Sequence, residues 1–346
     1  MINLRILLFF TTLLVLSCEP SGEKTTTSKR FEALIIDGSS NHYIWPKTTQ
    51  MMKSYLEETN LFKVSILRMN PSWLGEKYNK SRPVPYEGYF QDFPLPDQPT
   101  QSTNKPMDTI DFQVDFERYD LVLLNIGENT PEWPKSTKDA FESYMSNGGG
   151  MIVVHAANNA WGQWDAFNEM IGLGGWGGRD STNGPYVFYD DDGVIQQDLK
   201  EDTCATHGPE LEFLVTNRAL EHPIMQGVPL DWMHTKDEMY ARMRGPFKNA
   251  VILATAYSDP VLQTTPWDTT MKGSGRHEPM LLATNYGKGR VFHSVMGHFD
   301  YSQECVGFIT TLQRGAEWAV TGEVTQEIPQ DFPTAQESSS RSWKSD

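Results

Sequence analysis

The chain has 346 residues and a formal net charge of −16 at pH 7. A chain of this length can bury a large core and would allow one large domain or two. Phosphate binding needs clustered Lys and Arg side chains, and no basic run interrupts this acidic sequence, so we exclude nucleic acid as a partner.

Residues 1–17 are predicted to be the signal peptide of a lipoprotein. Arg5 precedes an apolar run at 6–16, which is too short to span a bilayer and typical of a secretory signal. The segment VLSC that ends at Cys18 resembles a bacterial lipobox, which implies that Cys18 carries the lipid after cleavage. The alternatives are an ordinary secretory signal and an uncleaved anchor. Residues 18–30 are polar and predict a flexible tether, so we expect attachment to the membrane of the cell envelope, on the periplasmic side or at the outer membrane.

The first half of the domain predicted for residues 31–322 alternates strands with helices. Apolar runs and alternating segments are typical of strands, and apolar residues at helical spacing are typical of helices. The predicted strands are 31–37, 62–69, 119–126 and 151–155, and the predicted helices are 45–59, 135–146 and 161–171. This order predicts an α/β fold with a mainly parallel sheet flanked by helices.

The second half predicts extra strands and a closing helix. The predicted strands are 211–216, 237–243, 250–256, 279–285 and 289–295, and the helix is 301–320. A Pro-rich insertion between Asn70 and Asp115 and a Gly- and Asp-rich stretch at 172–210 are irregular, and long loops of this kind are usually functional or disordered. Residues 323–346 are rich in polar residues and predict a disordered tail.

Polar side chains follow several of the predicted parallel strands. His155 ends the strand 151–155, His42 follows the first strand, and Glu128 follows the strand 119–126. Ligands of open α/β sheets bind outside the carboxyl ends of the strands. We therefore expect His155 to be catalytic and His42 and Glu128 to bind substrate. The alternative for each is a hydrogen bond that only caps a loop.

A second group of candidates lies between residues 221 and 298. Gly297 allows a sharp turn that presents His298, whereas His293 falls in mid-strand and is expected to be packed. Glu238 and Tyr240 would share one face of a strand, where a carboxylate beside a phenol could orient a sugar or a proton transfer. The alternative is a salt-bridged strand end at the surface. The candidate catalytic residues are therefore His155, His298, Glu238 and Glu278, and the candidate substrate-binding residues are His42, Glu128, His234, Tyr240 and Arg290.

Common catalytic motifs are missing from the sequence. It contains no G-x-S-x-G nucleophile elbow, no nucleotide-binding fingerprint and no C-x-x-C pair. Imidazole and carboxylate groups could instead hold one divalent ion such as zinc, with His155, His298 and Glu238 as candidate ligands. Spacing alone leaves metal binding open. Cys204 and Cys305 are a weak disulfide signal, so a disulfide and two free thiols are both open.

Six ordered segments together resemble the ThuA-like family, which takes its name from trehalose utilisation. They are YDLVLLN, NGGGMIVVHAA, EHPIMQGVP, HTKDEMYARMRGP, GRHEPML and YGKGRVFHSVMGH. The resemblance implies a three-layer, flavodoxin-like fold similar to class I glutamine amidotransferases. Where those enzymes carry a nucleophilic cysteine, this chain has His155, so glutaminase chemistry is not expected. His298 matches the place of the amidotransferase histidine.

The family resemblance also implies a class of substrate. Its members have been linked to 3-keto-glycosides, which implies an enzyme acting on an oxidised sugar or glycoside by acid–base or metal-assisted hydrolysis, elimination or isomerisation. The alternative is a lipoprotein that binds a glycan or a partner without catalysis. Many relatives carry Gly-Gly-x-Phe-x-x-His after the strand that ends at His155. Residues 174–180 read GGWGGRD and lack the histidine, so a ligand that relatives have at this place cannot be assumed for this chain. The sequence predicts neither the particular sugar nor the oligomeric state.

Overall fold

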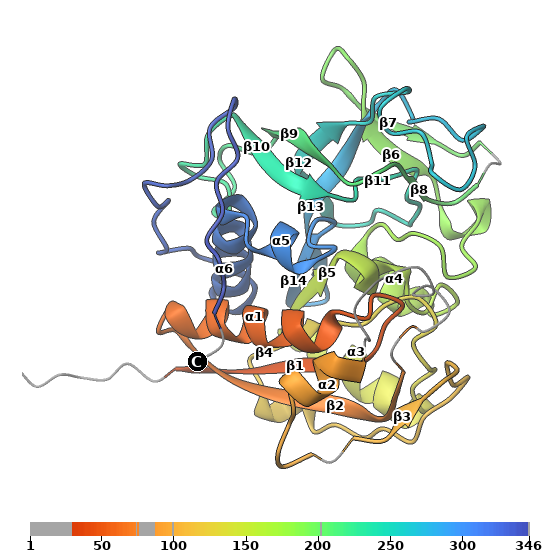
Figure 1. Cartoon of the computed structure of the whole chain (residues 1–346), viewed down its shortest axis with the longest axis vertical. Coiled ribbons are helices and arrows are strands. Elements are labelled where there is room, and N and C mark those ends of the chain that lie inside the picture. Colours follow the sequence, from red (N-terminus) through yellow and green to blue (C-terminus); the bar gives the residue numbers. More distant parts are fainter. Residues whose placement is uncertain (1–29, 74, 76–86, 99, 201–202, 345–346) are drawn as a thin grey trace, which may run out of the picture.

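The computed structural model describes residues 30–344 apart from 74, 76–86, 99 and 201–202 (Figure 1). The predicted signal peptide, the lipidation site Cys18 and all but the last residue of the tether lie outside the described residues. Among the helices that are described, none combines the length and the apolar character needed to cross a membrane.

A parallel block of strands forms the centre of the molecule. Its spatial order is β14-β5-β4-β1-β2-β3, and every neighbouring pair in it runs parallel. The strands are β1 (Phe31–Ser39), β2 (Phe62–Trp73), β3 (Ser102–Thr103), β4 (Leu121–Leu124), β5 (Gly150–Val154) and β14 (Gly289–Ser294). This arrangement confirms the predicted α/β fold with a mainly parallel sheet.

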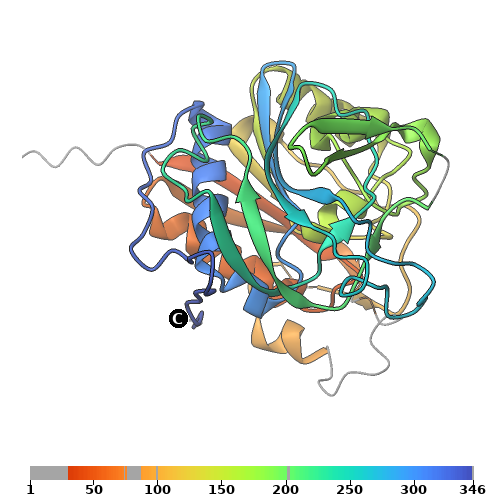
Figure 2. The same cartoon turned by 90° about the horizontal axis from the view of Figure 1, so that it is seen from above.

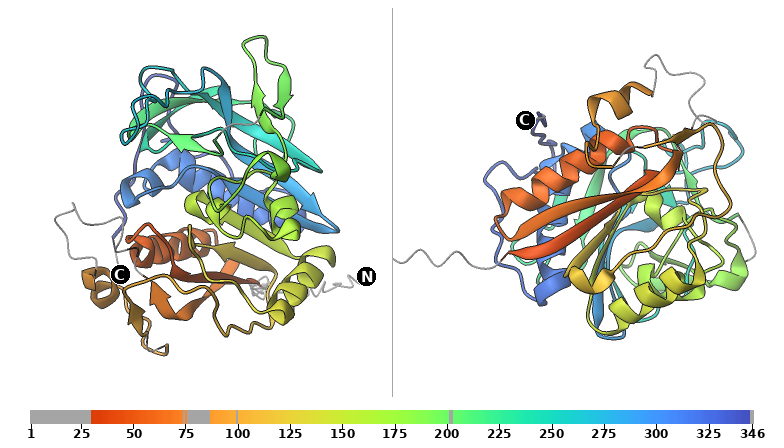
Figure 3. Two further views of the ribbon diagram at one scale, coloured as in Figure 1. Left: turned by 90° about the vertical axis from the view of Figure 1, so that its right-hand side faces the viewer. Right: turned by 90° about the horizontal axis from the view of Figure 1, so that it is seen from below.

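Helices cover both faces of the parallel block, so the inner strands are buried on both sides. In β1, Ala33 and Ile35 point into one core and Leu34 and Ile36 into the other, as the period of two requires. One face carries α1 (Trp45–Glu58), α2 (Glu87–Asp92), α5 (Asp300–Gln303) and α6 (Val306–Thr321), and the other carries α3 (Lys135–Ser146) and α4 (Asp165–Ile171) (Figures 1 and 3). Three layers result.

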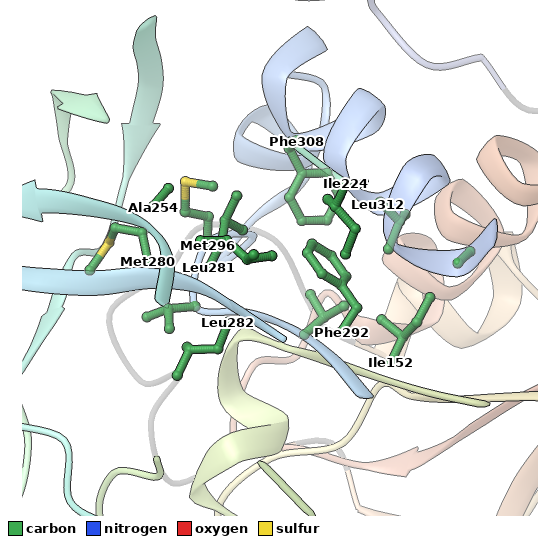
Figure 4. Packing of buried hydrophobic residues seen from close by; sticks show 14 of the residues in the cluster. Ile152, Ile224, Ala254, Met280, Leu281, Leu282, Phe292, Met296, Phe308 and Leu312 are labelled. Atoms are coloured by element: carbon green, nitrogen blue, oxygen red, sulfur yellow. The ribbon is translucent and has the colours of Figure 1, made fainter. Parts of the chain in front are cut away.

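The core beneath α6 joins this helix to the sheet. Phe308 and Leu312 of α6 face Phe292 of β14 and Ile152 of β5 (Figure 4). All four side chains are fully buried. Burial of a Phe, Leu or Ile side chain contributes roughly 1.5–3 kcal/mol, so this contact fixes the strands whose ends carry His155 and His298.

An antiparallel extension continues the sheet beyond β14. Its order is β10-β9-β12-β13, with β13 beside β14, and in Figure 1 it lies above the parallel block, while Figure 2 looks down onto it. The extension contains β9 (Leu211–Asn217), β10 (Asp231–Asp237), β12 (Ala250–Tyr257) and β13 (His277–Tyr286), with β6 (Tyr186–Tyr189) and β7 (Ile195–Asp198) at its side. The short strands β8 (Thr206–His207) and β11 (Tyr240–Ala241) pair separately.

Three element predictions are wrong in their bounds. Residues 237–243 are not one strand, because β10 ends at Asp237 and β11 begins at Tyr240, which leaves Glu238 in the connection. The helix expected at 161–171 begins only at Asp165, and the residues directly after β5 form the 3-10 helix η3 (His155–Asn159). The closing helix is divided into α5 and α6, since Cys305 has an extended ψ of 127°.

The expected disordered tail is also wrong for its described residues, 323–344. The ring of Phe332 lies 5.9 Å from that of Trp232, and Met233 N–H donates to the carbonyl of Thr334 at 2.7 Å. The tail has few apolar residues in a regular pattern, so its composition predicted disorder. It is ordered by contacts with residues elsewhere in the domain, such as Trp232 and Met233.

The two cysteines in the described part of the chain do not pair. Cys204 and Cys305 are both free and buried. Of the two alternatives that the sequence left open, the disulfide is therefore wrong.

Candidate functional site

A pocket of about 900 Å³ lies at the carboxyl edge of the parallel block. Its walls come from the loop after β1, from the β10–β11 connection, from the turn after β14 and from residues between η3 and β9. Its polar lining includes His42, Glu128, His207, Glu210, Glu238, Tyr240 and His298, and Trp176 and Trp267 are its large aromatic residues.

Four side chains meet beside this pocket, and three of them, His42, Glu238 and His298, line it. The four are His42, His155, Glu238 and His298, and one nitrogen or oxygen atom from each lies within 4.8 Å of the others. The ring centroid of His42 is 5.2 Å from that of His155 and 4.5 Å from that of His298. We call this set the inner cluster. Its members follow four different strands, β1, β5, β10 and β14. They meet because these strands end at the same edge of the sheet.

His155 is held in a backbone conformation that few residues adopt. It follows β5 directly and has a φ of 45°, in the left-handed region where residues other than glycine are uncommon and often functional. Its Nδ1 lies 2.7 Å from the carbonyl of Val295 and its Nε2 2.8 Å from the hydroxyl of Tyr240. A carbonyl only accepts, so Nδ1 carries the proton and Tyr240 O–H donates to Nε2.

Glu210 orients the ring of His298. His298 Nδ1 is 2.8 Å from Glu210 Oε1, and its Nε2 is 3.5 Å from Glu238 Oε1. Burial alone would raise the pKa of the Glu210 carboxyl, but the neighbouring His298 lowers it to about 2. The two atoms are close enough for an ion pair but are not aligned as a hydrogen bond, and Glu210 was not among the predicted residues.

Glu238 is a buried carboxylate surrounded by imidazoles. Its oxygens lie 3.7 Å from His155 Nε2 and 3.5 Å from both His207 Nε2 and His298 Nε2. Its residue is only 9% exposed. Burial would raise its pKa, but the imidazoles, His298 first, hold the pKa well below its usual range. No Lys or Arg in the described part of the chain forms an ion pair with it.

Asp237 ties the β10–β11 connection to the turn after β14. Its carboxylate accepts backbone N–H groups from Gly297 at 2.7 Å, His298 at 3.1 Å and Glu238 at 2.9 Å. Burial would raise the pKa of Asp237, but the hydrogen bond to His234 lowers it. Two residues of the inner cluster are therefore positioned by one buried side chain.

Three predicted site residues lie away from the pocket. His234 is fully buried behind it, 2.9 Å from Asp237, and although burial would lower its pKa, Cys305 and Asp237 raise that pKa to about 10. Glu278 is buried on β13, where burial raises its pKa and Ser274 is its side-chain partner. Arg290 starts β14, at the opposite end of that strand from His298, and donates to the carbonyl of Trp318.

His207 lines the pocket and was missed by the sequence analysis. Its Nδ1 bonds to the carbonyl of Gly208 at 2.8 Å, and its Nε2 points toward Glu238. Its ring lies 4.5 Å from that of Trp267 and 5.9 Å from that of Trp176. The available signal was a histidine in the long irregular stretch 172–210, which the pairing of β8 with β11 brings to the sheet edge.

Comparisons with known proteins agree with this architecture. A solved ThuA-like protein from Parabacteroides merdae is 35% identical, covers 90% of this chain and 98% of its own, and superimposes with a TM-score of 0.72. A ThuA-like protein from Bacteroides uniformis is 18% identical with a TM-score of 0.47, covering 86% and 93%. A search of curated proteins gives no match. The family model described as ThuA, trehalose utilisation, matches residues 100–319, so the chain belongs to the ThuA family, which suggests a carbohydrate-related function.

Proposed function

We propose that this protein is an enzyme that acts on an oxidised (3-keto) sugar or glycoside. The observation that carries the proposal is the inner cluster beside a pocket of about 900 Å³. Small-molecule sites typically measure roughly 300–1,000 Å³ and contain a few convergent polar groups. The family supports a carbohydrate as the substrate.

The chemistry requires a base and a group that stabilises an oxyanion. A ketone at C3 makes the neighbouring C–H acidic, and removal of that proton leaves an enolate whose charge is on the ketone oxygen. Loss of the group at C1 from this enolate gives elimination. Later addition of water gives net hydrolysis, and return of the proton to another carbon gives isomerisation. Nε2 of His155 and His298 and the carboxylate of Glu238 accept hydrogen bonds, so the inner cluster would stabilise the ketone oxygen only through a bound cation.

We assign the role of proton acceptor to His207. Its Nδ1 proton is held by the carbonyl of Gly208, so the lone pair of Nε2 is free to accept a proton from substrate. Burial lowers the pKa of His207, which keeps the imidazole neutral at neutral pH. His155 suits this role less, because the hydroxyl of Tyr240 occupies its Nε2 lone pair, and burial raises the pKa of Tyr240 so that the hydroxyl stays a donor.

The outer part of the pocket suits a neutral sugar ring. Trp267 is 61% exposed although it is large and apolar, and it stands beside His207. Aromatic faces pack well against the C–H faces of sugars, because both surfaces are apolar and flat. Glu128, Glu210 and Glu238 line the same pocket and would repel an anionic substrate.

Turnover of a 3-keto-disaccharide by the purified protein tests the proposal. His207→Gln should lower kcat by about 10²–10⁴-fold, the range for a general base, while binding of the sugar changes little. His277→Gln is the matched control, since His277 lies on β13 outside the pocket lining. The second candidate function is a non-catalytic glycan-binding protein, which the exposed Trp267 favours. Sugar binding without any product, with or without added divalent metals, would support this candidate and contradict an enzyme.

We also propose that the protein is a lipoprotein of the cell envelope. The support is Cys18 at the end of a short apolar run. Cys18→Ala should move the protein out of the membrane fraction, because the acyl chains would no longer be attached, and one chain alone binds a membrane only marginally. Unchanged membrane attachment with an unprocessed N-terminus would contradict lipidation and indicate an uncleaved anchor.

A further inference from the structure

We infer that the inner cluster, His42, His155, Glu238 and His298, is a binding site for one divalent metal ion of the zinc type. Three imidazoles and one carboxylate are a donor set that zinc and related ions accept. The inference does not depend on the proposed function, because ion binding can be measured without substrate.

The distances within the inner cluster are close to those that one ion requires. Zinc bonds of roughly 2.0–2.2 Å in a tetrahedral site put the ligand atoms about 3.4 Å apart. Glu238 lies 3.7 Å from His155 Nε2 and 3.5 Å from His298 Nε2. All four ligand atoms lie within 4.8 Å of one another, so small side-chain rotations are enough to close the set around an ion.

The outer nitrogens of the rings are held as metal ligands require. A metal-binding histidine usually donates its second ring N–H to a carbonyl or carboxylate, which fixes the ring and its tautomer. The carbonyl of Val295 does this for His155, and the carboxylate of Glu210 lies 2.8 Å from Nδ1 of His298, although these two atoms are not aligned as a hydrogen bond. Both rings therefore present Nε2 toward Glu238.

His42 supplies an independent sign of a missing partner. Its Nδ1 is buried and has no hydrogen-bond partner among the described residues. Buried polar atoms of native proteins are nearly always bonded, and an exception calls for an explanation. The ring of His42 lies 4.5 Å from that of His298, so a metal ion in the inner cluster would account for the orphaned nitrogen.

The charge of the inner cluster also favours a cation. Glu238 is nearly buried, and its partners in the described chain are imidazoles rather than Lys or Arg. A buried carboxylate needs a cationic or hydrogen-bonding partner, and a metal ion would be such a partner. With Glu210 beside His298, two carboxylates face one small region, which matches the charge of a divalent ion.

Tyr240 competes with the ion for one ligand atom. Its hydroxyl donates to His155 Nε2 at 2.8 Å, so an ion can bind His155 only when this hydrogen bond is broken. The inference therefore predicts that Tyr240→Phe keeps or strengthens ion binding. A bound ion would polarise the ketone oxygen of a 3-keto sugar as a Lewis acid.

The experiment measures metal in untagged protein by mass spectrometry, then removes the metal with a chelator and titrates the protein with Zn²⁺ and Co²⁺. We expect one ion per chain and a visible Co²⁺ absorption. Affinity should fall at least tenfold in His298→Ala and Glu238→Gln, and by about 10–100-fold in Glu210→Gln, whose residue only supports a ligand. His207→Gln and His277→Gln should still bind one ion.

His42→Gln tests ion binding in a variant that is expected to remain folded, in case the other variants do not fold. It replaces a ring whose buried nitrogen bonds to nothing in the described chain, so the melting temperature should hold while affinity falls at least tenfold. Failure of the wild-type protein to bind one ion, or wild-type affinity in the His42 and His298 variants, would overturn the inference. Ion binding without sugar turnover would support it and contradict only the proposed function.

Discussion

His293 differs from the pocket histidines in the way its ring is bonded. It is fully buried in β14, with Nε2 3.0 Å from the side-chain amide of Asn158 and Nδ1 3.0 Å from the carbonyl of Ile171. One nitrogen accepts and the other donates, so both are satisfied in the neutral ring. It is packed, as the sequence predicted, whereas His42 and His298 of the inner cluster line the pocket.

The burial of His293 predicts a loss of stability in acid. Burial lowers its pKa from 6.5 to about 4, so the neutral ring contributes stability above pH 6.5 that is lost as the pH falls toward 4. The loss should be on the order of 3 kcal/mol. Urea unfolding at pH 7, 5.5 and 4.5 checks this. His293→Gln, which cannot be protonated, should show a smaller decrease, and an equal decrease in both proteins would contradict the assignment.

Trp267 is expected to act on substrate binding rather than on chemistry. Trp267→Ala should raise KM for a 3-keto-disaccharide by about 5–30-fold with kcat nearly unchanged, because loss of an interaction equal in ground and transition states raises KM alone. Steady-state kinetics with disaccharide and monosaccharide substrates would check it. Trp343→Ala, in the C-terminal tail, is the control for loss of a tryptophan. A fall in kcat alone would place Trp267 in the reaction itself.

Only part of the site could be predicted from sequence. His42, His155 and His298 follow strands whose carboxyl ends meet at one edge, so their positions follow from the topology. His207 ends the two-residue strand β8, which is brought in by its pairing with β11, and Glu210 lies in the connection between β8 and β9. The distance of a residue from a strand end in the sequence gives no information about strand direction or burial, which is why His234, Glu278 and Arg290 were expected at the site but lie away from the pocket.

At the scale of elements, the turn after β14 sets the position of His298. Gly297 has a φ of 112°, and a Cβ there would lie 2.7 Å from the ring of Phe308 and 3.1 Å from Val154. The turn is therefore closed on two sides by packed side chains and on a third by Asp237, which accepts the N–H of Gly297. Only glycine fits both the backbone and the space.

Gly297→Ala should destabilise the protein by about 1–3 kcal/mol through overpacking, with further strain from the positive φ. It should also lower the affinity of the inner cluster for a metal ion, because His298 is the next residue and would be displaced. Urea unfolding measures the first effect and ion titration the second. Gly88→Ala is the control, since nothing lies within 4 Å of a Cβ there. A stable variant with wild-type ion affinity would show that the turn tolerates a side chain.

The parallel strands were predictable because burial on both faces makes them continuous apolar runs. The break between β10 and β11 was not predictable, since alternation continues across it. That break arises because Asp237 turns its carboxylate onto three backbone N–H groups, two of which lie far away in the sequence. Long-range contacts of this kind leave no local pattern.

At the scale of the whole molecule, the C-terminal tail fastens α6 and the extension together. Val306 N–H donates to the carbonyl of Ser339 and Met233 N–H to that of Thr334, so the tail touches both the start of α6 and β10. Phe332 covers Trp232 between them. The tail is therefore part of the folded domain.

Deletion of residues 325–346 should lower the free energy of unfolding by about 2 kcal/mol or more, because burial of a Phe side chain alone contributes roughly 1.5–3 kcal/mol. Phe332→Ala should reproduce much of this loss. Arg341→Ala should cost at most about 1 kcal/mol, since its ion pair with Asp331 is exposed. Urea unfolding of the three variants compares them. Equal stability of the deleted and full chains would contradict a structural role for the tail.

Asp237 lies in the antiparallel extension, whereas Gly297 and His298 belong to the turn that closes the parallel block. Separation of these two regions would remove the N–H groups of Gly297 and His298 from the carboxylate of Asp237 and would remove Glu238 from the three histidines. A partly folded chain therefore contains no inner cluster at all. These four groups come together only when the antiparallel extension has joined the parallel block, so this one carboxylate couples assembly of the inner cluster to complete folding.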